Sequence, residues 1–382
     1  MVPLSHIAVL GSTGSIGTSC LDVVRQHAGR LRIAGLAAHR SVERLCQQVS
    51  EFRPDWAVIG SEVVVIPEGR NEGTRWFRGT DCLRSLIRAP EIDTVVCAMV
   101  GAAGLPATWE AVDAGKRVAL ANKESLVVAG SLVMKRAAET GAQLIPVDSE
   151  HSAIYQCLQS GRREQLRRVI LTASGGPFRG RKRSELADVT PEMALKHPTW
   201  NMGPKITVDS ATMMNKALEI IEARWLFGLK AQQIAVTVHP QSLIHSLVEF
   251  DDGSVISQFS PPDMRLPIQY ALLFPDRLAG PAKQTDWTRA QTLELLPPDL
   301  EAFPALRLGF EAAARGGTCG AVLNAANEIA VERFLGGELS FLSITQVVED
   351  VLNHHQFDEQ PSMSELLAAD RWAREEAIRW KI

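Results

Sequence analysis

The sequence predicts an α/β protein with three parts: a doubly wound, Rossmann-like N-terminal domain, a central α+β domain and a C-terminal helical bundle. Short continuous apolar runs alternate with helical patterns over residues 1–148, as expected for a parallel sheet covered on both faces. A hairpin signal lies in the middle of the chain, and only helical periodicity follows residue 301.

Short apolar segments of the N-terminal part are predicted to be parallel strands. They are His6–Leu10, Leu31–Leu36, Trp56–Ile59, Thr94–Ala98, Val118–Ala121 and Leu144–Val147. The segments Ser15–Gln26 and Ser41–Phe52 between them place apolar residues at helical spacing. The alternation predicts one doubly wound domain over residues 1–148.

The central part, residues 149–275, is predicted to contain a mixed or antiparallel sheet. Its expected strands are Val169–Ala173, Ile234–Val238, Leu247–Phe250 and Val255–Phe259. The last two flank Asp251-Asp252-Gly253, which is a hairpin turn signal. Helices are expected directly after Glu150 and over Ala211–Phe227.

The C-terminal part begins with a connecting arm over residues 276–300, which is rich in proline and polar residues and has no clear periodicity. A helical bundle is predicted for residues 301–382. Its expected helices are Ala305–Ala314, Ala321–Leu335, Ile344–Asn353 and Met363–Arg379.

Composition argues against several classes of protein. With 46% hydrophobic residues, 22% charged residues and a net charge of −4, the chain resembles a soluble globular protein without affinity for nucleic acid. Its apolar runs are shorter than the ~18 residues that a membrane helix needs, and its first residues lack the pattern of a secretory signal. The six cysteines lack metal-ligand spacing, so we expect free, mostly buried thiols and a cytoplasmic location.

A glycine-rich turn, Gly11-Ser12-Thr13-Gly14-Ser15-Ile16-Gly17, follows the first strand and opens a helix. Glycines permit a tight turn and close backbone approach, and the helix N-terminus favours an anionic phosphate. The pattern therefore indicates a dinucleotide site. A tight strand–helix turn that binds nothing is the alternative.

The residues after the second strand indicate which dinucleotide is bound. Enzymes that use NAD usually place an acidic residue here, whereas this chain has Arg40 and Ser41. A cation and a hydroxyl suit a 2′-phosphate, so NADPH is favoured over NADH. The alternative is that Arg40 is a solvated surface cation.

Asn122, Lys123 and Glu124 follow the fifth strand, at the sheet edge where doubly wound proteins bind ligands. From this edge Lys123 could reach a substrate, while Asn122 and Glu124 could contact the nicotinamide half of the cofactor. A surface position for Lys123 is the alternative.

Three carboxylates predict a divalent metal site. Asp148 and Glu150 lie two residues apart on a segment expected to be extended, so their side chains point to the same side. With Glu219 from a helix they form an oxygen-rich pocket of the kind that Mg²⁺ or Mn²⁺ accepts. A helix-capping role explains one of the first two acids, but explains all three less well.

Further polar residues predict an anion pocket with a lid. Ser174 precedes two glycines in a turn whose backbone amides can hold a phosphate. Ser210 is expected before a helix that carries Asn215 and Lys216, with a Lys216–Glu219 ion pair as the alternative role for that lysine. Residues 194–204 are interrupted by prolines and a glycine, and this predicted lid carries the large apolar side chains of Trp200 and Met202, expected to be exposed until they cover a substrate.

The chain resembles the 1-deoxy-D-xylulose 5-phosphate reductoisomerase family over nearly its whole length. The matching stretches are GSTGSIG (11–17), ANKESLV (121–127), PVDSEH (146–151), TASGGPF (172–178), HPTWNMGPKITVDSATMMNKALEIIEA (197–223), HPQSLIHSLVEF (239–250) and CGAVLNAANEIAVERF (319–334). One departure is Ser41, where members often have asparagine.

The resemblance implies a role for each candidate residue. The metal ligands for Mg²⁺, Mn²⁺ or Co²⁺ would be Asp148, Glu150 and Glu219. The phosphate would be held by Ser174, Ser210, Asn215 and Lys216 with His197 beside them, and the reacting carbons contacted by Lys123, Ser149 and Glu150. NADPH would contact Thr13, Gly14, Ser15, Ile16, Arg40, Ser41, Asn122, Glu124 and Gly203.

The reaction that the resemblance implies has two stages in the non-mevalonate isoprenoid pathway. The metal first stabilises oxyanion charge while the substrate skeleton rearranges to a branched aldehyde, and NADPH then reduces that aldehyde to 2-C-methyl-D-erythritol 4-phosphate. A homodimer is also implied. The rival hypotheses are a metal-independent NADP-dependent dehydrogenase of another small phosphorylated substrate and a non-enzymatic protein that senses dinucleotide.

Overall fold

The computed structural model of the chain describes residues 3–64 and 73–381. Contacts between Cα atoms divide the chain into two compact units, which are described separately. Unit 1 comprises Met1–Asn122, Val133–Ser152 and Asp263–Lys283. Unit 2 comprises Lys123–Leu132, Ala153–Pro262 and Gln284–Ile382. The division predicted from the sequence, at residues 148, 275 and 300, stays a prediction.

Within the described residues, unit 1 is built on a seven-stranded sheet in the order β4-β3-β2-β1-β5-β6-β7, with every pairing parallel. The strands are β1 Ser5–Leu10, β2 Leu31–Ala38, β3 Trp56–Ile59, β4 Arg75–Arg78, β5 Thr94–Cys97, β6 Arg117–Leu120 and β7 Gln143–Pro146. The order reverses between β1 and β5, and at such a point α/β sheets bind ligands.

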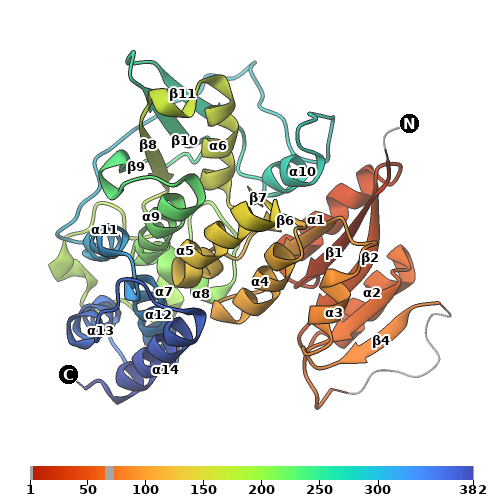
Figure 1. Ribbon diagram of the computed structural model, residues 1–382. Coiled ribbons are helices and arrows are strands. Elements are labelled where there is room, and N and C mark those ends of the chain that lie inside the picture. Colours follow the sequence, from red (N-terminus) through yellow and green to blue (C-terminus); the bar gives the residue numbers. More distant parts are fainter. Residues whose placement is uncertain (1–2, 65–72, 382) are drawn as a thin grey trace. The chain divides into compact units, whose positions relative to one another are not determined.

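The predicted doubly wound fold is confirmed, with one strand missed. The inner strands β1, β3 and β5 are almost wholly buried, which explains their continuous apolar sequences. The edge strand β4 has only two apolar residues between arginines, so its sequence lacks that signal. The helices of this unit are α1 Ser15–Gln26, α2 Val42–Phe52, α3 Leu83–Arg88, α4 Leu105–Asp113 and α10 Arg265–Leu273, and α10 packs against α1 (Figure 1).

The described part of unit 2 contains a four-stranded mixed sheet in the order β11-β10-β8-β9. The strands are β8 Leu166–Ala173, β9 Ile234–Val238, β10 Ile244–Phe250 and β11 Val255–Phe259. The β10–β11 pair is antiparallel around Gly253, whose φ of 85° suits glycine, so the predicted hairpin is confirmed. The β8–β9 pair is parallel and the β8–β10 pair antiparallel, as expected for a mixed sheet.

Two helices join the units. Helix α5, Lys123–Thr140, begins in unit 2, continues into unit 1 and has a non-helical residue at Ala129. Helix α6, Ser149–Cys157, begins in unit 1 and ends in unit 2.

The predicted helix over 211–227 is broken in the structure. Helix α8 covers Pro204–Ala211 and α9 covers Met214–Phe227, with α7, Pro191–Ala194, before them. The Thr212 hydroxyl donates to the Val208 carbonyl and accepts from the Met214 amide, so it competes with continuation of the helix. Met213 between the helices has a φ of 63°, which is uncommon outside glycine.

The predicted C-terminal helices are confirmed. They are α11 Ala305–Arg315, α12 Cys319–Leu335, α13 Phe341–His354 and α14 Met363–Arg379. Helix α12 packs against α13 and α14, and α11 packs against α9 (Figure 1). The predicted arm before them is irregular apart from a bridge between Leu296 and Val238. Central residues of α12, among them Ala325 and Ala326, are fully buried, and such small side chains permit close helix packing.

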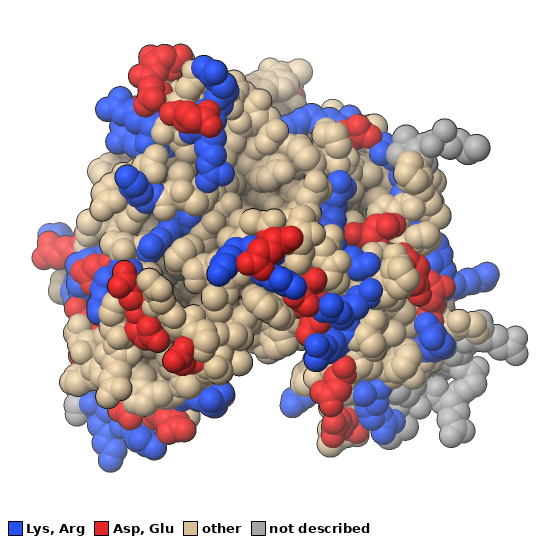
Figure 2. Space-filling model, in the orientation of Figure 1, with Lys and Arg blue, Asp and Glu red and all other residues tan. Residues whose placement is uncertain are grey.

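The surface and the thiols agree with the composition. Figure 2 shows Lys and Arg interspersed with Asp and Glu on the face drawn, as expected from a net charge of −4. All six cysteines lie in the described residues, and five of them are buried. None of the described helices is both long and apolar enough to cross a bilayer.

Candidate active site

The glycine-rich turn lies between β1 and α1, as predicted, and two of its glycines are required by packing. Gly11 has a φ of 88°, and a Cβ there would lie 2.4 Å from the Ala98 carbonyl oxygen. A Cβ at Gly17 would lie 2.4 Å from the Gly11 carbonyl oxygen. At Gly14, the N-cap of α1, the nearest atom would be 3.4 Å away, which is an ordinary contact.

Helix α2 fixes this turn through two side chains that sequence reasoning missed. The buried Gln48 amide donates to the Ser12 carbonyl oxygen at 2.9 Å, and its Oε1 accepts from the Ser12 hydroxyl at 2.8 Å. Arg44 donates to the Thr13 carbonyl oxygen at 2.8 Å. These bonds join residues more than thirty positions apart, so no local sequence pattern predicts them. They hold the turn in one conformation before a ligand binds.

Arg40 and Ser41 lie where the sequence predicts them, between β2 and α2, and both are exposed. Because all strands of this sheet are parallel, their carboxyl ends share one edge, so Arg40 and the glycine-rich turn lie at the same edge. The Arg44–Thr13 bond ties the two segments together. The arrangement suits a ligand with two separate phosphate groups.

Asn122 is buried at the end of β6, and its amide has a structural role. Its Nδ2 donates to the carbonyl oxygens of Met99 at 2.8 Å and Gly101 at 2.9 Å. The side chain therefore fixes the loop that follows β5, next to the point where the strand order reverses. The predicted contact of Asn122 with NADPH stays a prediction.

Asp148 and Glu150 are close together, but the expected extended segment is wrong. Helix α6 begins at Ser149, so Glu150 lies in its first turn. The two carboxylates still approach within 4.8 Å, because the side chains converge at the helix start. Ser149 donates to Glu150 Oε2 at 2.6 Å. His151, which the sequence analysis missed, is fully buried with Nδ1 3.9 Å from Asp148 Oδ2.

Glu219, the third predicted ligand, is fully buried on α9 in unit 2. Lys123 Nζ lies 3.2 Å from its Oε1, and Lys216 forms an ion pair with its Oε2. Asn215 Nδ2 donates to Glu219 Oε1 at 2.5 Å, and Asn215 Oδ1 accepts from Lys123 Nζ at 2.9 Å. Four predicted site residues thus form one buried cluster, in which the Lys216–Glu219 pair weighed as the alternative is present.

The Ser-Gly-Gly turn after β8 packs against α8. The Gly176 amide donates to the Ser174 hydroxyl at 3.2 Å, and a Cβ on Gly176 would lie 2.6 Å from the Ser210 carbonyl oxygen. Only glycine, here with a φ of 66°, permits this approach, so the structure brings Ser174 and Ser210 together. The expectation that Ser210 precedes a helix is wrong, since it lies inside α8.

The predicted lid segment is irregular between α7 and α8. His197 Nε2 lies 3.0 Å from the Ser174 hydroxyl, while its Nδ1 accepts from the amides of Thr199 and Trp200 at 3.1 and 2.9 Å. Burial lowers the pKa of His197 below its ordinary value of 6.5. Trp200 and Met202 are half-buried rather than exposed, and the Trp200 ring meets that of His245 edge-on at 6.4 Å.

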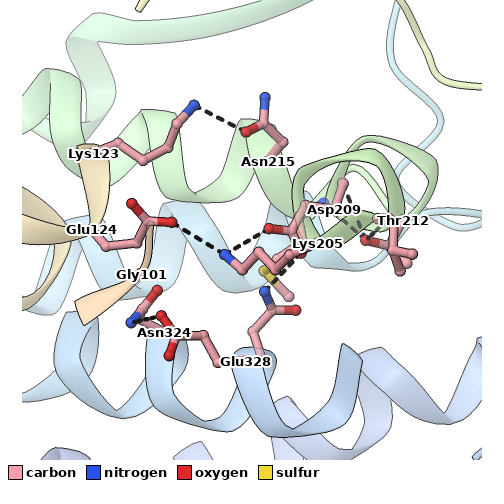
Figure 3. Close-up of polar contacts among 12 residues, drawn as sticks. Gly101, Lys123, Glu124, Lys205, Asp209, Thr212, Asn215, Asn324 and Glu328 are labelled. Atoms are coloured by element: carbon pink, nitrogen blue, oxygen red, sulfur yellow. Dashed lines mark hydrogen bonds and ion pairs between the residues drawn. The ribbon is translucent and has the colours of Figure 1, made fainter. Parts of the chain in front are cut away.

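A network of charges that sequence reasoning missed surrounds the start of α8. Lys205 Nζ lies 2.8 Å from Asp209 Oδ2 and 3.4 Å from Glu124 Oε1 (Figure 3). Asp209 Oδ1 accepts from Asn327 of α12 at 2.8 Å. The network places the predicted cofactor residue Glu124 in contact with the segment that directly follows Gly203.

Comparison with known families gives three matches along the chain. Residues 7–130 match the family described as 1-deoxy-D-xylulose 5-phosphate reductoisomerase. Residues 144–227 and 259–376 match the two C-terminal domains described for the same enzyme.

Individual relatives match this chain over nearly the whole length of both proteins. The 1-deoxy-D-xylulose 5-phosphate reductoisomerase of Solibacter usitatus is 49% identical, covering 97% of this chain and 96% of that protein. The enzyme of Pelodictyon phaeoclathratiforme is 51% identical over 99% of this chain and 100% of its own.

Solved structures of reductoisomerases also match. The Zymomonas mobilis enzyme in complex with NADPH has a TM-score of 0.92 at 42% identity, with 99% of both chains covered. A reductoisomerase in complex with NADPH, fosmidomycin and magnesium has a TM-score of 0.90 at 40% identity, with 98% of both covered. The chain therefore belongs to the 1-deoxy-D-xylulose 5-phosphate reductoisomerase family.

Proposed function

We propose that this chain converts 1-deoxy-D-xylulose 5-phosphate to 2-C-methyl-D-erythritol 4-phosphate with NADPH and a divalent cation. The observation that carries the proposal is the buried cluster around Glu219, where Lys123, Asn215 and Lys216 meet one carboxylate. Such a group of ammonium and carboxylate side chains suits a ligand that brings both a cation and an anion. The rival dehydrogenase of a phosphorylated substrate would need the anion site but not the cation.

The donor set suits a hard divalent cation. Asp148, Glu150 and Glu219 supply only carboxylate oxygens, which Mg²⁺ and Mn²⁺ prefer. In this role Ser149 holds Glu150 through its 2.6 Å hydrogen bond and fixes the direction of one carboxylate oxygen. When bound, the cation would act as a Lewis acid toward the substrate oxygens.

The substrate phosphate is assigned to residues of unit 2. Ser174 and Ser210 lie on two segments in van der Waals contact, and α9 begins four residues after Ser210 with Asn215 and Lys216 in its first turn. The N-terminus of a helix favours an anion, and Lys216 adds a full positive charge. His197 donates from Nε2 in its neutral form, because its Nδ1 accepts two backbone bonds.

The cofactor is assigned to the carboxyl edge of the unit 1 sheet. The turn residues Thr13, Gly14, Ser15 and Ile16 lie at the start of α1, where the first backbone amides of a helix suit a pyrophosphate; the Gly14 amide itself donates to the Gly11 carbonyl oxygen at 3.1 Å. Arg40 and Ser41 would read the 2′-phosphate, which distinguishes NADPH from NADH. Bound NADPH would supply the hydride. Glu124 and Gly203, which belong to unit 2, are assigned to the nicotinamide half.

The segment 194–204 is proposed to close over the substrate. Trp200, half-buried against His245, would pack over the substrate chain and exclude water before reduction. The Ser174–His197 bond joins this segment to the proposed phosphate pocket. A phosphate that binds in the pocket would therefore contact the lid segment through His197 as well.

A homodimer in the cytoplasm is the proposed state of the protein. Strand β11 is an edge of the unit 2 sheet, and Val255 and Ile256 on it are 51% and 38% exposed. The arm adds Trp287, which stacks on Phe259 of β11 at 5.4 Å and is 75% exposed. An exposed apolar edge strand favours pairing with another chain, and a second copy of the same edge is the simplest partner.

A coupled assay tests the function. Purified protein, 1-deoxy-D-xylulose 5-phosphate, NADPH and Mn²⁺ should consume NADPH and yield 2-C-methyl-D-erythritol 4-phosphate, identified by mass and stereochemistry. Chelator should abolish turnover, and added Mn²⁺ should restore it. Turnover that survives complete chelation would favour the metal-independent dehydrogenase, and no NADPH consumption under any condition would favour the dinucleotide-sensing protein.

A further inference from the structure

Lys205 occupies a position that local physics disfavours. It follows Pro204 in the first turn of α8, where the unsatisfied amides of the helix repel a cation. It is also largely buried, with 20% of its side chain exposed. Local preference would place an acidic or neutral residue here. A cation at such a site indicates that nearby acidic side chains stabilise it.

Carboxylates from several elements surround this ammonium group. Asp209 lies one turn further along α8, and Glu124 lies in the first turn of α5. Burial alone would lower the pKa of Lys205, but Asp209, Glu124 and the more distant Glu328 together raise it well above its ordinary value. Lys205 is therefore charged at every physiological pH.

The C-terminal helices hold this arrangement from the other side. Asn327 on α12 donates to Asp209, and the adjacent residue Glu328 pairs with Arg374 of α14 at 2.6 Å. Asp209 and Asn327 are 1% and 0% exposed, so the bond between them is fixed by packing. Figure 3 shows Glu124, Lys205 and Asp209 in line, with Glu328 on the neighbouring helix.

We propose that Lys205 is a positioning residue for NADPH, which sets the carboxylate of Glu124 and joins it to the end of the lid segment. Glu124 and Gly203 are the two unit 2 residues assigned above to the cofactor, so the inference rests on that part of the proposed function. Lys205 contacts the first directly and lies two residues after the second. The Gly203 carbonyl oxygen accepts from the amide and hydroxyl of Thr207 in the same turn.

The chemical reason is charge. NADPH carries several negative charges, so a carboxylate placed near its nicotinamide ribose is repelled by them less when a neighbouring cation compensates its charge, and it can then accept hydrogen bonds from the ribose hydroxyl groups at a lower electrostatic cost. Lys205 compensates the charge of Glu124, so the lysines assigned to the substrate are not needed for this role. With Lys205 removed, Glu124 would lose a charge partner and Asp209 would face it in a poorly solvated region.

The experiment compares Lys205→Met with Arg333→Met as a matched control. Arg333 is similarly buried, at 18% side-chain exposure, and pairs with Glu338, and it contacts neither Glu124, Glu328 nor α8 in any described ion pair. Both variants should lose thermal stability. Only Lys205→Met should raise the NADPH Kd, measured by fluorescence without substrate or metal, by roughly 10- to 100-fold, as for the loss of a charge-assisted contact.

Steady-state kinetics separate positioning from general damage. The KM for NADPH should rise in Lys205→Met while the KM for the sugar phosphate changes by less than about threefold. Lys205→Arg, which keeps the charge, should recover most of the affinity. Lys205→Gln replaces the Met variant if circular dichroism shows that the latter does not fold.

A double-mutant cycle with Glu124→Gln completes the test. If Lys205 acts through Glu124, the double variant binds NADPH about as weakly as the weaker single variant, whereas independent roles give additive losses. Unchanged NADPH affinity in Glu124→Gln would overturn the assignment of Glu124 itself. A normal Kd in Lys205→Met, with Glu124→Gln impaired, would overturn the role of Lys205 and leave the proposed function intact.

Discussion

At the scale of single residues, the site is dominated by charges that are buried together. Glu219 has no exposed surface, and Lys123, Lys216 and Asn215 account for both of its oxygens. A carboxylate in this setting serves stability as well as chemistry, because removing it leaves two buried ammonium groups facing each other.

Glu219→Gln tests both roles. We expect a loss of stability of about 3–5 kcal/mol from the uncompensated lysines. Turnover at saturating metal should fall about 10²–10³-fold through lost transition-state stabilisation. Urea unfolding and metal-titrated assays measure the two effects. Glu249→Gln is the control, since Glu249 also faces two cations, Arg167 and Arg168, but on the surface. Near-normal activity of the Glu219 variant would remove it from the metal site.

Lys216→Ala decides between the two roles weighed for this lysine. If Lys216 binds the phosphate, the variant should lose about 10²-fold in kcat/KM on the phosphorylated substrate, and little on an analogue without phosphate. Equal losses on both substrates would mean that the lysine serves only its ion pair with Glu219. Lys230→Ala, at an exposed lysine after α9 and outside the lid segment, provides the comparison.

Arg40→Ala and Arg44→Ala should differ in kind. Arg40 is assigned to the 2′-phosphate, so its loss should weaken NADPH binding by roughly 1.5–3 kcal/mol, which appears as a higher KM for NADPH. The KM for NADH should scarcely change. Arg44 holds the Thr13 carbonyl, so its loss should weaken both cofactors alike. The NADPH/NADH ratio of KM values in each variant gives the answer. If Arg40→Ala keeps the wild-type ratio, another residue recognises the 2′-phosphate.

At the scale of elements, the lid segment depends on a neutral histidine. His197 Nδ1 accepts the amides of Thr199 and Trp200, and protonation would remove that acceptor. Burial lowers its folded pKa, so the unfolded chain binds the proton first as the pH falls. Its stabilising contribution is therefore complete above about pH 6.5 and declines below it, toward the folded pKa.

This sign gives a measurable pH dependence. Between about pH 7 and pH 5, the wild type should lose more stability than His197→Gln, which has no titrating group at this position. Thermal melts across that range measure the difference, and protease cleavage within 194–204 should increase in the wild type at the lower pH. His354→Gln on the exposed end of α13 should keep the wild-type slope. Equal slopes in the His197 variant and the wild type would refute this account.

At the scale of the whole molecule, sequence predicted the architecture better than the local detail of the site. The strands β1, β3 and β5 are buried on both faces, and burial of this kind leaves a continuous apolar run that can be read directly. The sequence analysis missed strand β4, because only its two half-buried central residues are apolar. It also missed the helix break at Met213, which depends on the hydroxyl of Thr212. The motifs located the candidate residues, whereas the Asp209–Asn327 bond joins positions 118 apart and leaves no local signal.

The proposed dimer is a prediction for the whole assembly. Ile256→Lys places a charge on the exposed edge strand β11, and such charges prevent edge-to-edge pairing. Light scattering after size-exclusion chromatography should give a dimer for the wild type and a monomer for the variant at low protein concentration. Val63→Lys, at a position 88% exposed in unit 1, should stay dimeric. A wild-type monomer at all concentrations would reject the proposed assembly.

The three glycines of the turn after β1 have a consequence for mutational tolerance. Gly11 and Gly17 leave no room for a Cβ, so alanine at either position should abolish folding whatever the ligand. Gly14 has that room, so alanine there should give a folded protein whose defect appears only when a dinucleotide must approach the backbone. A deep mutational scan that scores abundance and activity separately should therefore show low abundance for substitutions at Gly11 and Gly17. Substitutions at Gly14 should keep the abundance and lower the activity.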